Sequence, residues 1–199
     1  MATVWHGSRM TLNPVEVRVL GCLLEKQRTT PDQYPLSLNA LRLAANQTTS
    51  RDPVTDYDEA AIRKALETLG DRGWTRLASG PGSRAAKFRH LLDDALQLAP
   101  PQLALLAVLM LRGPQTAAEL RSRSERLHAF ASNDEVEETL RGLAERELVA
   151  EGSRHRWQQL LGGGGEPSPA PLTAAESPDL EARVAELERV VAELQERLG

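Results

Sequence analysis

Five basic side chains in the first half of the chain have the charge and the spacing needed to contact nucleic-acid phosphates. Three of them follow a Gly-Pro-Gly turn on a predicted hairpin: Arg84, Lys87 and Arg89. Two more are neighbours on the helix predicted before that hairpin: Arg63 and Lys64. Cations on a protruding hairpin can reach phosphates or a minor groove, and helix side chains can reach base edges. The pattern is consistent with DNA contact through this part of the chain, and a plain solvated hairpin is the alternative for the wing.

Nearby acidic side chains favour a solvated mixed-charge surface instead. Glu67 and Asp71 share the outer face of the predicted helix with Lys64, and carboxylates there would repel phosphates. Residues 1–95 carry 13 basic and 11 acidic side chains, while the whole chain has a net charge of −4. DNA-binding domains usually show a clear basic excess. DNA binding is therefore the leading hypothesis, and a protein-interaction adaptor that does not bind DNA is the alternative.

Three further arginines cluster in the second half of the chain: Arg121, Arg123 and Arg126. They could bind phosphate. The next predicted helix, however, is acidic, with four carboxylates in its first turns: Asp134, Glu135, Glu137 and Glu138. The arginines could equally pair with these carboxylates. We expect this half to contact protein or a partner subunit.

The residue types that carry catalysis are sparse and scattered. Four histidines show no metal-ligand spacing, and the chain contains no phosphate-binding loop, nucleophile elbow or zinc-protease motif. The single cysteine, Cys22, lies on the apolar face of a predicted helix, where a thiol is usually buried and inert. We expect no enzyme activity, no metal and no cofactor.

Two polar loop segments contain side chains that could bind a ligand: Tyr34, Asn46, Gln47 and Arg51. Binding residues often lie in loops. Such side chains also tie loops down by satisfying backbone donors and acceptors. The second, structural interpretation is favoured.

Helix and strand patterns in the first half follow the order of a winged helix. A helix is expected from Pro14 to about Gln27, with Asn13 as its N-cap. Ser37 caps a second helix, and a third runs over about 58–72. Residues 74–77 and 86–89 alternate like the two strands of a hairpin. Three helices followed by a hairpin place the third helix and the wing where DNA recognition occurs in this fold.

The same order recurs at an offset of 74 residues. Three core positions of the third helix match: Ile62 with Val136, Leu66 with Leu140, and Leu69 with Leu143. Helices are expected from Pro100, after the Thr116 cap, and from Ser132 or Asn133, with strands at 148–150 and 155–157. Chance alignment of two amphipathic helices is the alternative. The repeated order favours a second winged helix.

The predicted fold is mainly α with small β-hairpin wings. Two tandem winged-helix domains occupy 10–95 and 98–161, a Gly/Pro linker occupies 162–179, and a coiled-coil helix occupies 180–198. A heptad seam, expected to reinforce a homodimer already made by the winged helices, consists of Leu180, Val184, Leu187, Val191, Leu194 and Leu198. Alternatively, this helix docks on its own second domain.

The ends and the apolar runs of the chain show no targeting segment. The first ten residues lack the apolar stretch of a secretory signal, and the run 103–111 is too short to span a membrane. We therefore expect a soluble cytoplasmic protein without membrane contact.

Several motifs in the chain resemble those of the YceH-like family of uncharacterised bacterial proteins. In the first half they are Leu23-Leu24-Glu25-Lys26-Gln27, Thr29-Thr30-Pro31, Tyr34-Pro35-Leu36, Asn46-Gln47 and Arg51-Asp52-Pro53-Val54. In the second half they are Leu111-Arg112-Gly113-Pro114-Gln115-Thr116 and Glu119-Leu120-Arg121-Ser122-Arg123. The resemblance covers about residues 10–160. It implies a tandem winged-helix fold and a dimer, and it implies no known activity.

Overall fold

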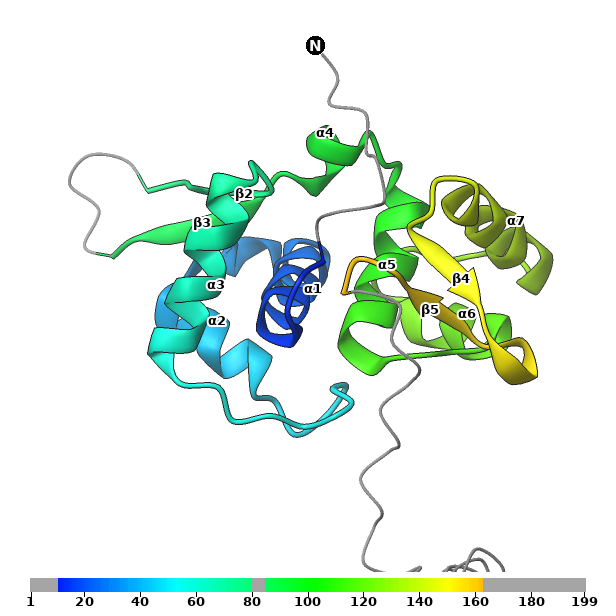
Figure 1. The fold of residues 1–199 in the computed structure, drawn as a ribbon, viewed down its shortest axis with the longest axis horizontal. Helices are drawn as coiled ribbons and strands as arrows, with labels where there is room; N and C mark the ends of the chain where they lie inside the picture. The colour runs from blue at the N-terminus through cyan, green and yellow to red at the C-terminus, as the bar shows by residue number, and fades with distance from the viewer. Residues whose placement is uncertain (1–10, 80–84, 163–199) are drawn as a thin grey trace, which may run out of the picture. The chain divides into compact units, whose positions relative to one another are not determined.

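The computed structural model describes residues 11–79 and 85–162, all within one unit that spans residues 1–167 (Figure 1). It is mainly helical, with two small antiparallel sheets. Within the described residues, no helix is long and apolar enough to cross a membrane. The predicted linker beyond 162 and the coiled-coil seam lie outside the described residues.

The first half contains three helices and a three-stranded sheet. The helices are α1 (Pro14–Thr29), α2 (Leu38–Ala45) and α3 (Glu59–Asp71). The strands are β1 (Leu36–Ser37), β2 (Thr75–Leu77) and β3 (Lys87–His90), in the order β1-β3-β2. The predicted helices and the β2–β3 hairpin are confirmed. The sequence did not reveal β1, because a two-residue strand after a proline shows no alternation.

Side-chain caps set the helix starts, as their residue types predicted. Asn13 accepts a hydrogen bond from the Glu16 backbone, and the Glu16 carboxylate accepts one from the Asn13 backbone, which completes a capping box. The side chains of Ser37 and Asp58 cap α2 and α3 by accepting a hydrogen bond from the backbone N–H three residues on, without the reciprocal bond of a capping box. The helices therefore begin where local chemistry satisfies their free N–H groups.

The second half repeats the helix order with a shorter hairpin. Its helices are α5 (Pro100–Arg112), α6 (Ala117–Ser124) and α7 (Asn133–Ala144), and its strands are β4 (Val149–Glu151) and β5 (Trp157–Gln159). The return strand begins two residues later than predicted. Residues Ser153–His155 form a 3₁₀ turn, and Trp157 forms a backbone bridge with Gln115 that aligns the strand. A short helix, α4 (Leu92–Leu96), connects the halves.

The two halves share one continuous core. Helices α1 and α5 lie side by side at the centre of the fold (Figure 1). Gly21 on α1 allows this close approach, because a Cβ there would lie 3.0 Å from side-chain atoms of Leu111 and Met110. The buried apolar residues of both halves form a single cluster. The two tandem domains that the sequence predicts therefore do not have separate cores in the described residues, because the apolar faces of α1 and α5 cover each other.

Candidate nucleic-acid interface

The β2–β3 hairpin carries three cations on one face. Arg76 of β2 lies directly opposite Arg89 of β3, and Lys87 is two residues from Arg89 on the same strand. Cross-strand partners and alternate residues point to the same side of a sheet. Thr75 and His90 are buried on the opposite side. We call the set Arg76, Lys87 and Arg89 the wing cations.

The wing cations form no ion pair with the carboxylates of the described residues. Arg76 and Lys87 are exposed and Arg89 is half-buried. Among the described residues, no carboxylate forms an ion pair with any of the three. The Nε atom of Arg89 is buried and has no hydrogen-bond partner among those residues. Like charges placed directly opposite each other in a sheet are destabilising, so this face favours an anionic partner.

Sequence reasoning identified two of the wing cations and missed the third. Lys87 and Arg89 were predicted, while Arg84 lies outside the described residues. Arg76 was assigned to a strand but not to the site. The alternation in Thr75-Arg76-Leu77 could have placed it outward, but its pairing with Arg89 depends on the hairpin register.

The predicted cations of α3 are held by neighbouring carboxylates. Arg63 donates to Glu59 at 2.8 Å, and Lys64 lies 3.7 Å from Glu67. Both pairs are more than half exposed, so each contributes little to stability. In the described structure, no hydrogen bond or ion pair links these residues to the wing cations. The outer face of α3 thus has the mixed-charge character of the alternative interpretation.

Arg121 and Arg123 do not form ion pairs with the carboxylates of α7, which was one of the two alternatives for the arginine cluster of the second half. The Arg121 guanidinium donates to the backbone carbonyls of Phe130 and Ala131. Arg123 lies 3.7 Å from Glu119, on its own helix. Arg121 thus holds the loop before α7 through carbonyl oxygens rather than carboxylates.

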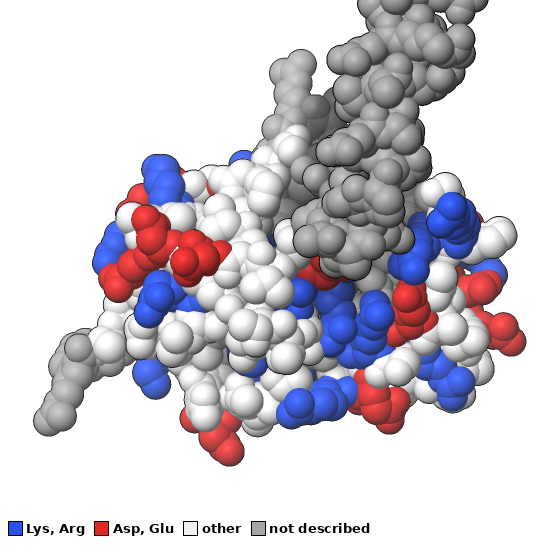
Figure 2. All heavy atoms as spheres, turned by 90° about the horizontal axis from the view of Figure 1, so that it is seen from below, with Lys and Arg blue, Asp and Glu red and all other residues white. Residues whose placement is uncertain are grey.

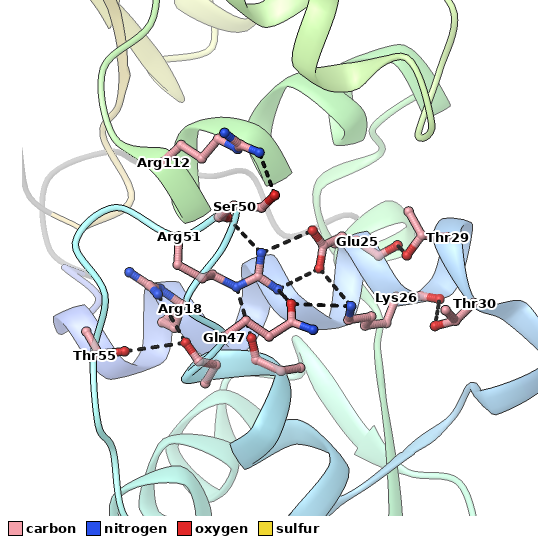
Figure 3. Close-up of polar contacts among 12 residues, drawn as sticks. Arg18, Glu25, Lys26, Thr29, Thr30, Gln47, Ser50, Arg51, Thr55 and Arg112 are labelled. Atoms are coloured by element: carbon pink, nitrogen blue, oxygen red, sulfur yellow. Dashed lines mark hydrogen bonds and ion pairs between the residues drawn. The ribbon is translucent and has the colours of Figure 1, made fainter.

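The polar loop residues in the first half hold the chain together. Arg51 is fully buried, and all five of its N–H groups have acceptors (Figure 3). The acceptors are the Glu25 carboxylate, the Gln47 side chain and the carbonyls of Ala44 and Ser50. Burial alone would lower the pKa of Arg51, but the hydrogen bonds and the charge of Glu25 outweigh it and raise the pKa.

Three other polar side chains tie loops in a similar manner. Arg18 of α1 donates to the carbonyls of Ala45 and Pro53. Asn46 accepts from the Tyr57 backbone N–H and donates to its carbonyl, both at 2.8 Å. The Tyr34 hydroxyl accepts from the His90 backbone at 2.8 Å, and burial raises its pKa to about 12. The structural interpretation of the loop motifs predicted such contacts for Asn46 and Tyr34, whereas the role of Arg18 was not predicted.

Catalytic features are few in the part of the chain that the structure describes. Cys22 is fully buried, and burial raises the pKa of its thiol to about 11, which keeps it protonated at neutral pH. No group of three His, Cys, Asp or Glu side chains with metal-binding geometry occurs among the described residues.

Comparisons with known proteins place these features in a family. Residues 12–156 match a family described as "Protein of unknown function, DUF480". A UPF0502 protein of Geotalea uraniireducens is 56% identical, with 69% of this chain and 62% of the relative covered. A UPF0502 protein of Shewanella sp. (strain MR-4) is 44% identical, with 95% of this chain and 96% of the relative covered. A UPF0502 protein of Dechloromonas aromatica is 49% identical, with 92% of this chain and 92% of the relative covered. In agreement with the resemblance of its motifs, the chain belongs to the DUF480/UPF0502 family of uncharacterised bacterial proteins.

Proposed function

We propose that the protein is a DNA-binding, transcription-regulator-like dimer built from two tandem winged helices. Each half has three helices followed by a β-hairpin, the order of a winged helix. In this fold α3 takes the place of the recognition helix and the β2–β3 hairpin is the wing. The proposed activity is binding and not catalysis.

The wing cations carry the proposal. Arg76 and Arg89 are opposed across the hairpin, and Lys87 extends the same face toward its tip. A phosphate backbone lying along this face would offset their mutual repulsion and give each cation an oxygen partner. Such contacts position a protein on a duplex without reading its sequence. The site therefore supports DNA affinity and does not name an operator.

Helix α3 would supply the second set of contacts. Arg63 and Lys64 are exposed, and their pairs with Glu59 and Glu67 are weak enough to exchange for phosphate. The carboxylates on the same helix would lower the affinity relative to a basic recognition helix. We therefore expect modest, strongly salt-dependent binding.

The second half is a poor match to DNA and fits a protein surface. The exposed face of α7 is acidic, and its Arg141 is paired with Glu137 at 2.9 Å. Acidic side chains repel phosphates. We assign this half to contacts with protein or with a partner subunit.

Binding to duplex DNA of random sequence, measured by anisotropy over a range of KCl concentrations, tests the DNA proposal. Replacing Arg76 and Lys87 with Ala in the full chain should weaken binding and flatten the salt slope by about 0.9 for each phosphate that is no longer neutralised. Arg154→Ala, which removes one exposed charge from the β4–β5 hairpin, is the control for each of the single variants Arg76→Ala and Lys87→Ala. If the control weakens DNA binding and flattens the salt slope by the same amount, the wing cations are not the DNA-binding site.

Absence of binding at the lowest salt would favour the adaptor alternative. Three large apolar side chains would then be the candidates for contact with a partner: Leu43, Val54 and Leu77, which are 56–57% exposed. Large apolar side chains in such positions suit a protein partner. In that case Leu77 of the wing, rather than its cations, would be the contact residue.

The dimer is proposed from the heptad seam in the sequence, which lies outside the described residues. Leu187→Asp places a charge in the seam, whereas Glu193→Ala changes a residue outside it. Because the seam is expected to reinforce the dimer, sedimentation of the full chain should show a weaker dimer for the first variant only. A Leu187→Asp protein that sediments as wild type would contradict the coiled coil.

A further inference from the structure

A cavity of about 260 Å³ lies where the first half meets the second. Ser50, from the loop between α2 and α3, forms part of one wall. Three arginines from α5, α6 and the turn that follows α6 line it as well: Arg112, Arg123 and Arg126. Lys and Arg atoms also gather near the middle of the face shown in Figure 2. We call this space the junction cavity.

The acidic residues of the junction cavity do not neutralise its arginines. Glu25 lines it, but its carboxylate is bound by Arg51 at 2.6 Å and also approached by Lys26 at 3.4 Å. In the described part of the chain, Arg112 and Arg126 form no ion pair with a carboxylate. Glu125 is the other acidic lining residue, so a net positive charge is left.

Arg123, the third arginine of the cavity, forms only a long ion pair. Arg123 lies 3.7 Å from the Glu119 carboxylate. Arg156 approaches the same carboxylate more closely, at 3.1 Å. Arg123 can therefore turn to another anion while Glu119 keeps a cationic partner.

Ser50 is fixed in place at the wall of the cavity. The Arg112 Nη2 donates to its Oγ at 2.6 Å, and the Arg51 Nη1 donates to its carbonyl at 2.8 Å (Figure 3). Its backbone is in the left-handed region, with φ of 61°, which a residue other than glycine adopts only when its surroundings enforce it. Because the Oγ already accepts a hydrogen bond, its own proton is available to donate to a ligand.

The cations in this region are close enough to repel one another. Burial lowers the pKa of Arg112, and the charges of Arg123 and Arg51 lower it further. Like charges held together at a partly buried site are stabilised by an anion that binds between them.

We propose that the junction cavity binds a small ligand through a phosphoryl group held by Arg112, Arg123 and Arg126. Planar guanidinium groups bind phosphate oxygens bidentately, and the Ser50 hydroxyl adds a donor. The apolar side chains of Leu111 and Leu127 also line the cavity and suit the remainder of the ligand. The volume is slightly below the usual ~300 Å³ lower bound of ligand sites, which favours a small molecule over a duplex.

The bound ligand would hold the two halves together. Ser50 belongs to the first half, whereas Arg123 and Arg126 belong to the second, and one phosphoryl group would contact all three. This site shares no residue with the wing cations. Its existence therefore does not depend on DNA binding.

Titration calorimetry of the full chain with inorganic pyrophosphate, at constant ionic strength, tests the proposal. We expect saturable binding and a rise in Tm with pyrophosphate. Arg112→Gln and Arg126→Gln should each weaken binding by roughly 10- to 100-fold, since each removes a charged hydrogen-bonding partner. Arg126 is exposed, so its variant should fold normally even if Arg112→Gln does not. Arg42→Gln, on α2 and away from the cavity lining, should bind like wild type.

Three outcomes would overturn the proposal. The first is no saturable pyrophosphate binding at up to about 10 mM, well above the range of useful affinities. The second is an equal loss in Arg42→Gln, which would indicate diffuse charge attraction. The third is a loss of duplex DNA binding in Arg126→Gln without pyrophosphate binding, which would assign these arginines to a DNA surface instead.

Discussion

Arg51 and Glu25 form a two-point ion pair between the loop that follows α2 and helix α1. The distances are 3.1 Å for Nη1–Oε1 and 2.6 Å for Nη2–Oε2. The Arg51 side chain is fully buried, and that of Glu25 is 16% exposed. Burial would raise the pKa of Glu25, but the hydrogen bonds and charge of Arg51 outweigh it and lower the pKa. The loop is thereby fixed beside the end of α5, where the backbone N–H of Asp52 donates to the Leu111 carbonyl.

Arg51→Met should destabilise the protein by about 3–5 kcal/mol. It leaves the Glu25 carboxylate without its main partner, and it leaves the carbonyls of Ala44 and Ser50 without the hydrogen bonds that Arg51 donates. Chemical denaturation measures this loss. Arg63→Met is the control, since the Arg63–Glu59 pair is exposed and should be worth about 0.5 kcal/mol or less. Similar losses for the two variants would contradict the structural role of Arg51.

His90 should make stability depend on pH. Burial lowers its pKa to about 4; Arg89 and Arg28 act in the same direction, while Asp93 and Asp94 oppose them. The unfolded chain therefore takes up the proton first. The stabilisation from neutral His90 is complete above about pH 6.5 and is lost as the pH falls toward 4.

His90→Gln should flatten the fall in unfolding free energy between pH 6.5 and 4. Gln can still donate toward Gln27, whose Oε1 lies 2.7 Å from the His90 Nε2. Denaturation at a series of pH values measures the slope. His155→Gln, at an exposed histidine, should leave the slope as in wild type. Identical slopes for wild type and His90→Gln would show that another group titrates.

Local chemistry made much of the fold predictable. The residues Asn13, Ser37 and Thr116 cap helices where their types and spacing indicated, because a cap depends on only a few neighbours in the sequence. The inward faces of α3 and α7 also follow from spacing alone.

Features that depend on distant parts of the chain were not predictable. Hydrophobic spacing shows that a helix has an apolar face but not which helix packs against it. The contact between α1 and α5 was therefore seen only in the structure. The sequence favoured a structural role for Arg51, but it could not identify Glu25, which lies 26 positions away, as its partner. The junction cavity likewise needs the first-half loop and α6 to meet. Sequence alone grouped Arg123 and Arg126 but could not add Arg112 and Ser50 to them.

Leu66→Ala and Leu140→Ala should each cost about 2–5 kcal/mol, since each truncates a side chain that is at least 96% buried. Because the core is continuous, each variant should shift one shared thermal transition, followed by circular dichroism. Leu43→Ala is the control, at a leucine that is 56% exposed. Two separate transitions, each moved by one variant only, would show that the halves unfold as independent domains.

Two helical glycines should respond to alanine with opposite signs. A Cβ at Gly21 would lie 3.0 Å from atoms of Leu111 and Met110, whereas one at Gly142 meets nothing within 4 Å. Alanine favours a helix by about 1 kcal/mol over glycine, so Gly142→Ala should stabilise by ~0.5–1 kcal/mol. Overpacking costs about 1–3 kcal/mol, so Gly21→Ala should show a net loss of up to ~2 kcal/mol. Denaturant midpoints at equal slope measure both changes. A stabilised Gly21→Ala protein would show that α1 and α5 do not pack as closely as described, whereas a destabilised Gly142→Ala protein would place an unseen contact on α7.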